Sequence, residues 1–114
     1  MRLRSDIWVD AYRRRAEAGG AYVMMQRRGT AESGAIFLHI DRLDGSGVLF
    51  GPAPQAMEDV LEDGGRRFQR QHDADTLDNT AIAARLGREL RFDSDLWIVV
   101  VEDRQGRSFL DVPG

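Results

Sequence analysis

The chain has 114 residues, a size typical of a single domain with one hydrophobic core. Hydrophobic residues make up 42% of it and charged residues 31%, and no apolar run approaches the roughly 18 residues that cross a bilayer. We therefore expect one domain over residues 1–114 that makes no membrane contact. Because no apolar secretory segment follows the N-terminus, we also expect a cytoplasmic location.

Two residue types that carry much of enzyme chemistry are absent. Without cysteine the chain has no disulfide, thiolate nucleophile, iron–sulfur ligand or cysteine-bound zinc. All 16 basic residues are arginine, which also excludes Schiff-base chemistry on lysine and the phosphate-binding lysine of a P-loop. The sequence predicts no cofactor, and an enzyme is the less favoured class of protein.

The first predicted element is an amphipathic helix that Ser5 or Asp6 can cap and that ends at Gly19 and Gly20. Its apolar residues recur at helical spacing and are Ile7, Trp8, Ala11, Tyr12 and Ala16. From residue 21 the period changes to two, which predicts strands over 21–26 and 35–41. The glycine-containing loop 29–34 between them favours a hairpin, and a turn at 44–47 leads into a third strand at 48–50.

The second half alternates polar segments with apolar ones. Residues 55–65 are predicted as a short helix or loop, and 66–72 as a polar edge strand. Asp78 or Asn79 can cap a helix with Ile82, Leu86 and Leu90 on one face. Residues 96–101 are apolar on both faces, as in a central strand, and 107–110 are predicted as a last short strand.

These elements predict an α+β fold. Its antiparallel sheet would have five to six strands, with an N-terminal helix and a second helix before the last hairpin.

Clustered arginines are the candidate binding residues. The first 28 residues hold seven arginines and three acids, whereas the remainder holds nine arginines and sixteen acids. Guanidinium groups bind phosphates and carboxylates in a bidentate manner, so convergence of these side chains would create an anion site. The candidates are Arg13, Arg14, Arg27, Arg28, Arg66 and Arg67. The alternative interpretation is a set of solvated surface charges, and a pI near 5.3 argues against nucleic acid as the ligand.

The two histidines do not indicate a metal site. Neither His39 nor His72 stands at a spacing that places two ligands on one helix face, so no metal is predicted. His39 lies on a predicted strand and is a candidate for a catalytic base, although a structural histidine is the simpler interpretation. No serine stands in a nucleophile-elbow motif, so no catalytic residue is assigned.

Three functional hypotheses are compatible with this pattern. The first is a small interaction domain that binds a protein partner or forms a homodimer through the apolar strand 96–101 and the exposed-looking Tyr22, Met24 and Phe37. The second is anion or nucleic-acid binding through the N-terminal arginines. The third is an enzyme that uses Arg27, His39 and carboxylates brought together by folding.

Several short segments resemble a known family. The matching segments are residues 2–9, 34–37, 51–55, 67–68 and 95–99, together with Glu102 and Asp103. They are similar to the domain of unknown function 1491 family of alphaproteobacteria over the whole chain. The resemblance implies a bacterial, stand-alone domain, and it carries no activity over to this protein.

Overall fold

The computed structural model describes residues 2–53 and 60–110. The elements follow one another as α1 (Ser5–Ala18), β1 (Tyr22–Arg27), β2 (Ile36–Asp41), β3 (Ser46–Pro52), β4 (Leu61–Asp63), β5 (Arg66–Arg70), β6 (Leu77–Asp78), α2 (Asn79–Phe92) and β7 (Trp97–Glu102). The predicted α+β class, the N-terminal helix and a second helix before the last strand are confirmed. In the described ranges, no helix is long and apolar enough to cross a membrane.

All the described strands belong to one mixed sheet. Its order is β1-β7-β2-β3-β5-β4, with β6 paired to β3 outside this path. β2 and β7 run parallel, in register from Ile36 beside Trp97 to Asp41 beside Glu102, and the other pairs are antiparallel. The predicted β2–β3 hairpin is confirmed, but the prediction of a purely antiparallel sheet was wrong.

The predicted hairpin of β1 and β2 was also wrong, because β7 lies between these two strands. Their connecting loop crosses the start of β7, where the Thr30 amide donates to the Asp95 carbonyl at 2.9 Å. Gly29 makes this crossing possible, since a Cβ there would stand 2.1 Å from the same carbonyl oxygen. β7 is buried on both faces, as its sequence predicted, and this explains its central position.

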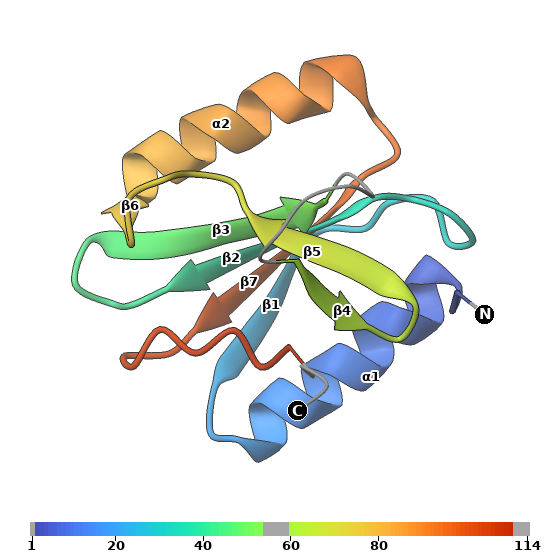
Figure 1. The fold of residues 1–114 in the computed structure, drawn as a ribbon, viewed down its shortest axis with the longest axis horizontal. Coiled ribbons are helices and arrows are strands. Elements are labelled where there is room, and N and C mark those ends of the chain that lie inside the picture. The colour runs from blue at the N-terminus through green and yellow to red at the C-terminus, as the bar shows by residue number, and fades with distance from the viewer. Residues whose placement is uncertain (1, 54–59, 111–114) are drawn as a thin grey trace.

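One helix covers each face of the sheet (Figure 1). α1 packs Trp8, Val9 and Tyr12 on the face that carries the larger apolar cluster. α2 packs Ile82 and Leu86 on the opposite face, where a second cluster forms. The buried stripe of α1 therefore includes Val9, whereas Ile7, which the helical spacing assigned to it, is 51% exposed.

Three local predictions differ from the structure at the sheet margins. β5 is not an edge strand, because β4 pairs with its outer side. In the segment 55–65, residues 61–63 form this strand rather than a helix or loop, while 55–59 lie outside the described residues. Residues 107–110 form no strand. They pack against α1 instead, where the Tyr12 hydroxyl donates to the Ser108 carbonyl at 2.5 Å.

Candidate anion-binding site

Arg66 is buried to a degree unusual for arginine, with only 4% of its surface exposed. It begins β5 directly after the turn at Gly64 and Gly65, whose positive φ angles of 59° and 79° suit glycine. The β4–β5 hairpin is attached to α1, because the Trp8 indole donates to the Asp63 carbonyl at 2.9 Å. The turn and this contact place the Arg66 side chain beside the N-terminal end of α1.

Among the described residues, neutral groups alone hold the Arg66 guanidinium. Its Nη2 donates to the Ser5 hydroxyl at 2.7 Å and to the Leu3 carbonyl at 3.1 Å. The Ser5 hydroxyl in turn donates to the Gly34 carbonyl at 2.6 Å. The Nε of Arg66 is buried and has no hydrogen-bond partner. One donor of this buried cation is therefore left unsatisfied. The Nε atoms of Arg15 and Arg27 also lack a partner, but both of those side chains are more exposed than Arg66.

The positive charge of Arg66 also lacks a counter-charge. In the described part of the chain, no carboxylate forms an ion pair with it. Burial, together with the nearby charge of Arg2, lowers the pKa of Arg66 to about 10. The group remains protonated at neutral pH, and a buried cation without a partner is energetically unfavourable. An anion bound here would remove this penalty.

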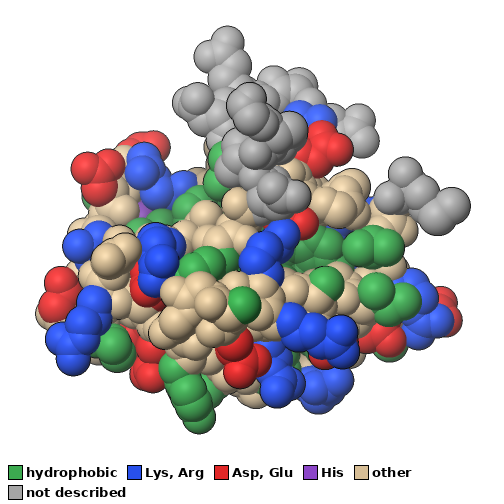
Figure 2. Space-filling view, turned by 90° about the horizontal axis from the view of Figure 1, so that it is seen from below, with side chains coloured by type: hydrophobic (Ala, Val, Ile, Leu, Met, Phe, Trp, Pro, Cys, Tyr) green, Lys and Arg blue, Asp and Glu red, His purple; other side chains and the backbone are tan. Residues whose placement is uncertain are grey.

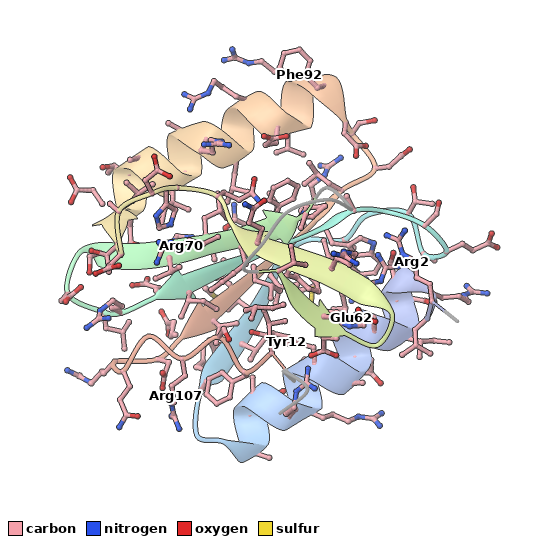
Figure 3. The ribbon with its side chains drawn as sticks, viewed as in Figure 1. Arg2, Tyr12, Glu62, Arg70, Phe92 and Arg107 are labelled. Carbon is pink, nitrogen blue, oxygen red and sulfur yellow. The ribbon has the colours of Figure 1, made fainter. Side chains whose placement is uncertain are left out.

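A cavity of about 20 Å³ adjoins Arg66. The residues that line it are Arg2, Ile36, Pro52, Arg66, Arg67 and Phe68. Arg66, Ile36 and Phe68 are buried and form its inner wall, whereas Arg2 and Pro52 are exposed and lie toward solvent. Arg2 lies at the N-terminal end of α1, well separated from Arg70 and Arg107 (Figure 3). Three arginines thus border one small space.

The structure brings together only two of the six arginines predicted as anion ligands. Arg66 and Arg67 both line the cavity, whereas Arg13 and Arg14 lie on the solvent side of α1. There, Arg13 pairs with Glu17 at 2.7 Å and Arg14 with Asp10 at 2.8 Å. Arg13 and Arg14 therefore lie as the alternative interpretation expects, as solvated charges on a helix surface.

Arg27 and Arg28 have other partners at the end of β1. Arg27 donates to the Ser94 carbonyl at 2.6 Å, and Arg28 lies over the Trp97 ring at 5.4 Å from its centre. Arg2, by contrast, lines the cavity although the sequence singled it out only as part of the basic N-terminal segment. Its position beside Arg66 depends on long-range packing, which no local pattern reveals.

His39 belongs to a polar network on the α2 side of the sheet. Its Nε2 lies 2.9 Å from the Asn79 Oδ1, and the Asn79 amide donates to Asp41 at 3.0 Å. Arg27 takes no part in this network, since its guanidinium contacts Ser94. His39 is 8% exposed, and its contacts fix the start of α2 against β2.

His72 is held by the backbone. Its Nε2 accepts a hydrogen bond from the Leu49 amide at 3.1 Å, and its Nδ1 lies 2.7 Å from the Ala74 carbonyl oxygen. An amide donor on one ring nitrogen and a carbonyl acceptor at the other require the neutral tautomer with the proton on Nδ1. His72 therefore ties the loop after β5 to β3.

Two larger hollows contain arginines that are hydrogen-bonded within the chain. One, of about 590 Å³, includes Arg70 and Arg85, which donate to the carbonyls of His72 and Gln71. The other, of about 330 Å³, includes Asp103 and Arg107, which form a bidentate ion pair. Neither offers a buried, unsatisfied donor comparable with the Nε of Arg66.

Neither metal chemistry nor a broad basic surface is evident in the described residues. Histidines and carboxylates form no group of three or more that could hold a metal ion there. On the face shown in Figure 2, arginines and acidic side chains are interspersed rather than separated into areas of one sign. The cavity at Arg66 is therefore the site with the clearest chemical preference.

Comparison with known proteins identifies the family. The sequence profile of "Protein of unknown function (DUF1491)" matches residues 3–111. No match was found among curated proteins. The fold is similar to the crystal structure of a DUF1491 family protein from Caulobacter crescentus, with a TM-score of 0.79 and 36% identity over 99% of this chain and 97% of the other.

A second similar structure is the solution structure of protein Atu0922 from A. tumefaciens. It has a TM-score of 0.79 and 39% identity over 98% of this chain and 95% of the other. An NMR structure of a DUF1491 family protein from C. crescentus has a TM-score of 0.78 and 38% identity over 99% of this chain and 96% of the other. With a profile match over nearly its full length and relatives above 30% identity, the chain belongs to the DUF1491 family.

Proposed function

We propose that this domain binds a small anionic group in the cavity bordered by Arg2, Arg66 and Arg67. The observation that carries the proposal is the buried Arg66 guanidinium, which has a free Nε donor and no carboxylate partner among the described residues. Proteins pair buried charges or bind ions to them, because an uncompensated charge is costly in a low-dielectric surrounding. A bound anion would supply both the counter-charge and the missing acceptor.

The electrostatic surroundings support the same ligand class. Arg2 contributes a second positive charge close enough to lower the pKa of Arg66. Ser5, which binds Arg66, is the first residue of α1, and the N-terminal end of a helix carries partial positive charge. These charges attract anions and repel cations. They act on one small cavity, which favours a single anionic group over the long phosphate chain of a nucleic acid.

Thermal unfolding of the full chain in the presence of anions tests this proposal. Sodium acetate, phosphate and chloride are titrated at constant ionic strength, set with a bulky sulfonate buffer salt. A ligand that binds only the folded state stabilises it, so at least one of these anions should raise the midpoint saturably, by about 5 °C at ten times its Kd.

Three variants locate the effect. Arg66→Met and Arg2→Gln should lose or weaken the anion-dependent rise, whereas Arg14→Gln removes the same charge from a side chain that is 79% exposed and should keep it. Arg2→Gln keeps the test valid if Arg66→Met does not fold, because Arg2 is exposed. The proposal fails if no anion raises the unfolding midpoint of the wild type. It also fails if Arg2→Gln shows the same anion-dependent rise as Arg14→Gln and the wild type.

A second candidate function is homodimerisation through the outer edge of β1. No described strand pairs with that edge, and Tyr22 and Met24 on it are 61% and 43% exposed. Phe37, which the sequence grouped with them, is 6% exposed and packs in the α2-side cluster, so it offers no such surface. Unpaired edges with apolar side chains can pair with a second copy. Sedimentation equilibrium at high micromolar concentration should then detect a dimer that Met24→Lys abolishes; a monomer throughout would remove this candidate.

A further inference from the structure

The size of the cavity limits which anion can enter it. A volume of about 20 Å³ exceeds the roughly 10–15 Å³ needed for one water-sized group but leaves little room beyond that. A carboxylate presents two oxygens in one plane, whereas a phosphate presents four in a tetrahedron. Because it is flat, a carboxylate fits a small space beside Arg66 more easily than a tetrahedral phosphate does.

The charge at the inner wall points to the same group. Arg66 is the buried cation there, whereas Arg67 is partly exposed and Arg2 is exposed to solvent, which weakens their fields. One negative charge is enough to balance one buried guanidinium, and a dianion would have to bury a second charge as well. The planar fork of a guanidinium also matches the planar geometry of a carboxylate.

Three of the six residues that line the cavity are apolar. Ile36 and Phe68 are 1% and 2% exposed, and Pro52 continues the apolar surface toward solvent. A fully hydrated ion such as phosphate gains nothing from these side chains. A carboxylate attached to a hydrocarbon group gains contact with Pro52 as its charged end reaches Arg66, since apolar surface leaves water on binding.

We infer that the ligand of this site is a monovalent carboxylate attached to an apolar group. The inference rests on the proposed function and narrows it to one ligand class. The carboxylate can belong to a small organic acid or to the C-terminus of a peptide that ends in an apolar residue, because both present the same planar charge on a hydrocarbon carbon.

Calorimetric titration of the full chain tests whether the site prefers apolar carboxylates to other anions. The probes are formate, acetate, propionate and butyrate, together with inorganic phosphate and chloride at the same ionic strength. Affinity should rise from formate to butyrate, by up to about threefold for each methylene that contacts the lining. Phosphate and chloride should bind at least tenfold more weakly than butyrate.

A peptide pair identifies the source of the carboxylate. A pentapeptide that ends in leucine is titrated as the free acid and as the C-terminal amide. If the site takes peptide C-termini, the free acid binds more tightly than butyrate and the amide does not bind. If it takes small acids, butyrate binds more tightly than both peptides, and the inference stands in either case.

Matched variants tie binding to the cavity. Arg2→Gln should weaken butyrate about tenfold, as expected for one lost charge-assisted contact, and Arg14→Gln should leave it unchanged. If phosphate or chloride binds as tightly as butyrate and Arg2→Gln weakens that binding, the carboxylate inference is overturned while the proposed anion site remains. If none of the probes binds, both are overturned.

Discussion

The Nη2 of Arg66 donates a 2.7 Å hydrogen bond to the Oγ of Ser5, and this buried contact joins the β4–β5 hairpin to the first turn of α1. Ser5 passes the connection on by donating to the Gly34 carbonyl at 2.6 Å, in the loop before β2. Three segments distant in sequence thus meet around one guanidinium. The Nε of the same guanidinium is buried without a partner, and it is on this donor that the proposed binding site rests.

Ser5→Ala should destabilise the fold, because it removes two buried hydrogen bonds and deprives the Arg66 cation of an acceptor. We expect a loss of about 1–3 kcal/mol in the free energy of unfolding, measured by urea denaturation. Ser33→Ala, in the exposed part of the loop, is the control and should change stability by less than about 0.5 kcal/mol. Equal effects of the two substitutions would show that the Ser5 contact does not stabilise the fold.

The Asp103–Arg107 pair should make stability depend on pH. Arg107 donates to both carboxylate oxygens of Asp103, at 3.1 and 2.8 Å, and its amide adds a third bond at 2.8 Å. The side-chain hydrogen bonds from Arg107 lower the pKa of Asp103, although burial opposes them. Because the pKa is lower in the folded state, the stabilisation is complete above the unfolded value of about 3.9 and is lost as pH falls through the folded value.

Asp103→Asn should therefore cost about 1–3 kcal/mol at pH 7, and the difference from the wild type should shrink as the pH falls below about 5. Urea denaturation at a series of pH values measures this difference. Asp10→Asn, at an exposed helix pair, should show little effect at any pH. A constant gap between Asp103→Asn and the wild type down to acid pH would contradict the assignment.

Two glycine substitutions should change stability in opposite directions. At Gly47 an added Cβ would stand 2.5 Å from the Ile40 carbonyl oxygen and 2.6 Å from the Asn79 Oδ1, so Gly47→Ala should cost about 1–3 kcal/mol. At Gly87, within α2, nothing lies within 4 Å of the added Cβ, and Gly87→Ala should stabilise by about 0.5–1 kcal/mol. Thermal denaturation of both variants measures these changes in stability. A stable Gly47→Ala would show that the contact between Asn79 and His39 is not tightly packed.

The core on the α2 side should be sensitive at Ile82, which is fully buried. Ile82→Ala leaves a cavity between α2 and the sheet and should cost about 2–5 kcal/mol. Phe92 is a larger side chain but is 88% exposed, so Phe92→Ala should change stability by less than about 0.5 kcal/mol. Chemical denaturation compares the two, and a comparable loss at Phe92 would mean that this exposed ring packs in solution.

Local signals predicted those parts of the fold that local interactions determine. The stripe of Ile82, Leu86 and Leu90 predicted α2, and the turn at 44–47 predicted the β2–β3 hairpin, because neighbouring residues form these elements. The insertion of β7 between β1 and β2 was not predicted. Trp97 lies beside Ile36 although about sixty positions separate them, and sequence periodicity carries no information about such pairing.

The candidate site shows the same limit. Arg66 and Arg67 were among the predicted anion ligands, but their place in the fold was assigned to a polar edge strand. The alternation of Arg66 with Phe68 was the available signal, since residues two apart on a strand face the same side and Phe68 is in the core. The burial of Arg66 depends on β4 and α1, which pack against it from other parts of the chain.

The Nε–H resonance of Arg66 in a ¹⁵N-edited NMR spectrum of the full chain tests the central claim most directly. Its assignment follows from the loss of one signal in Arg66→Met. On titration with butyrate at constant ionic strength, we predict that this resonance shifts downfield and saturates, because the free Nε donor gains a charged acceptor. An Arg66 Nε–H signal that stays unchanged while butyrate, phosphate and chloride are each raised to high millimolar concentration would contradict the account.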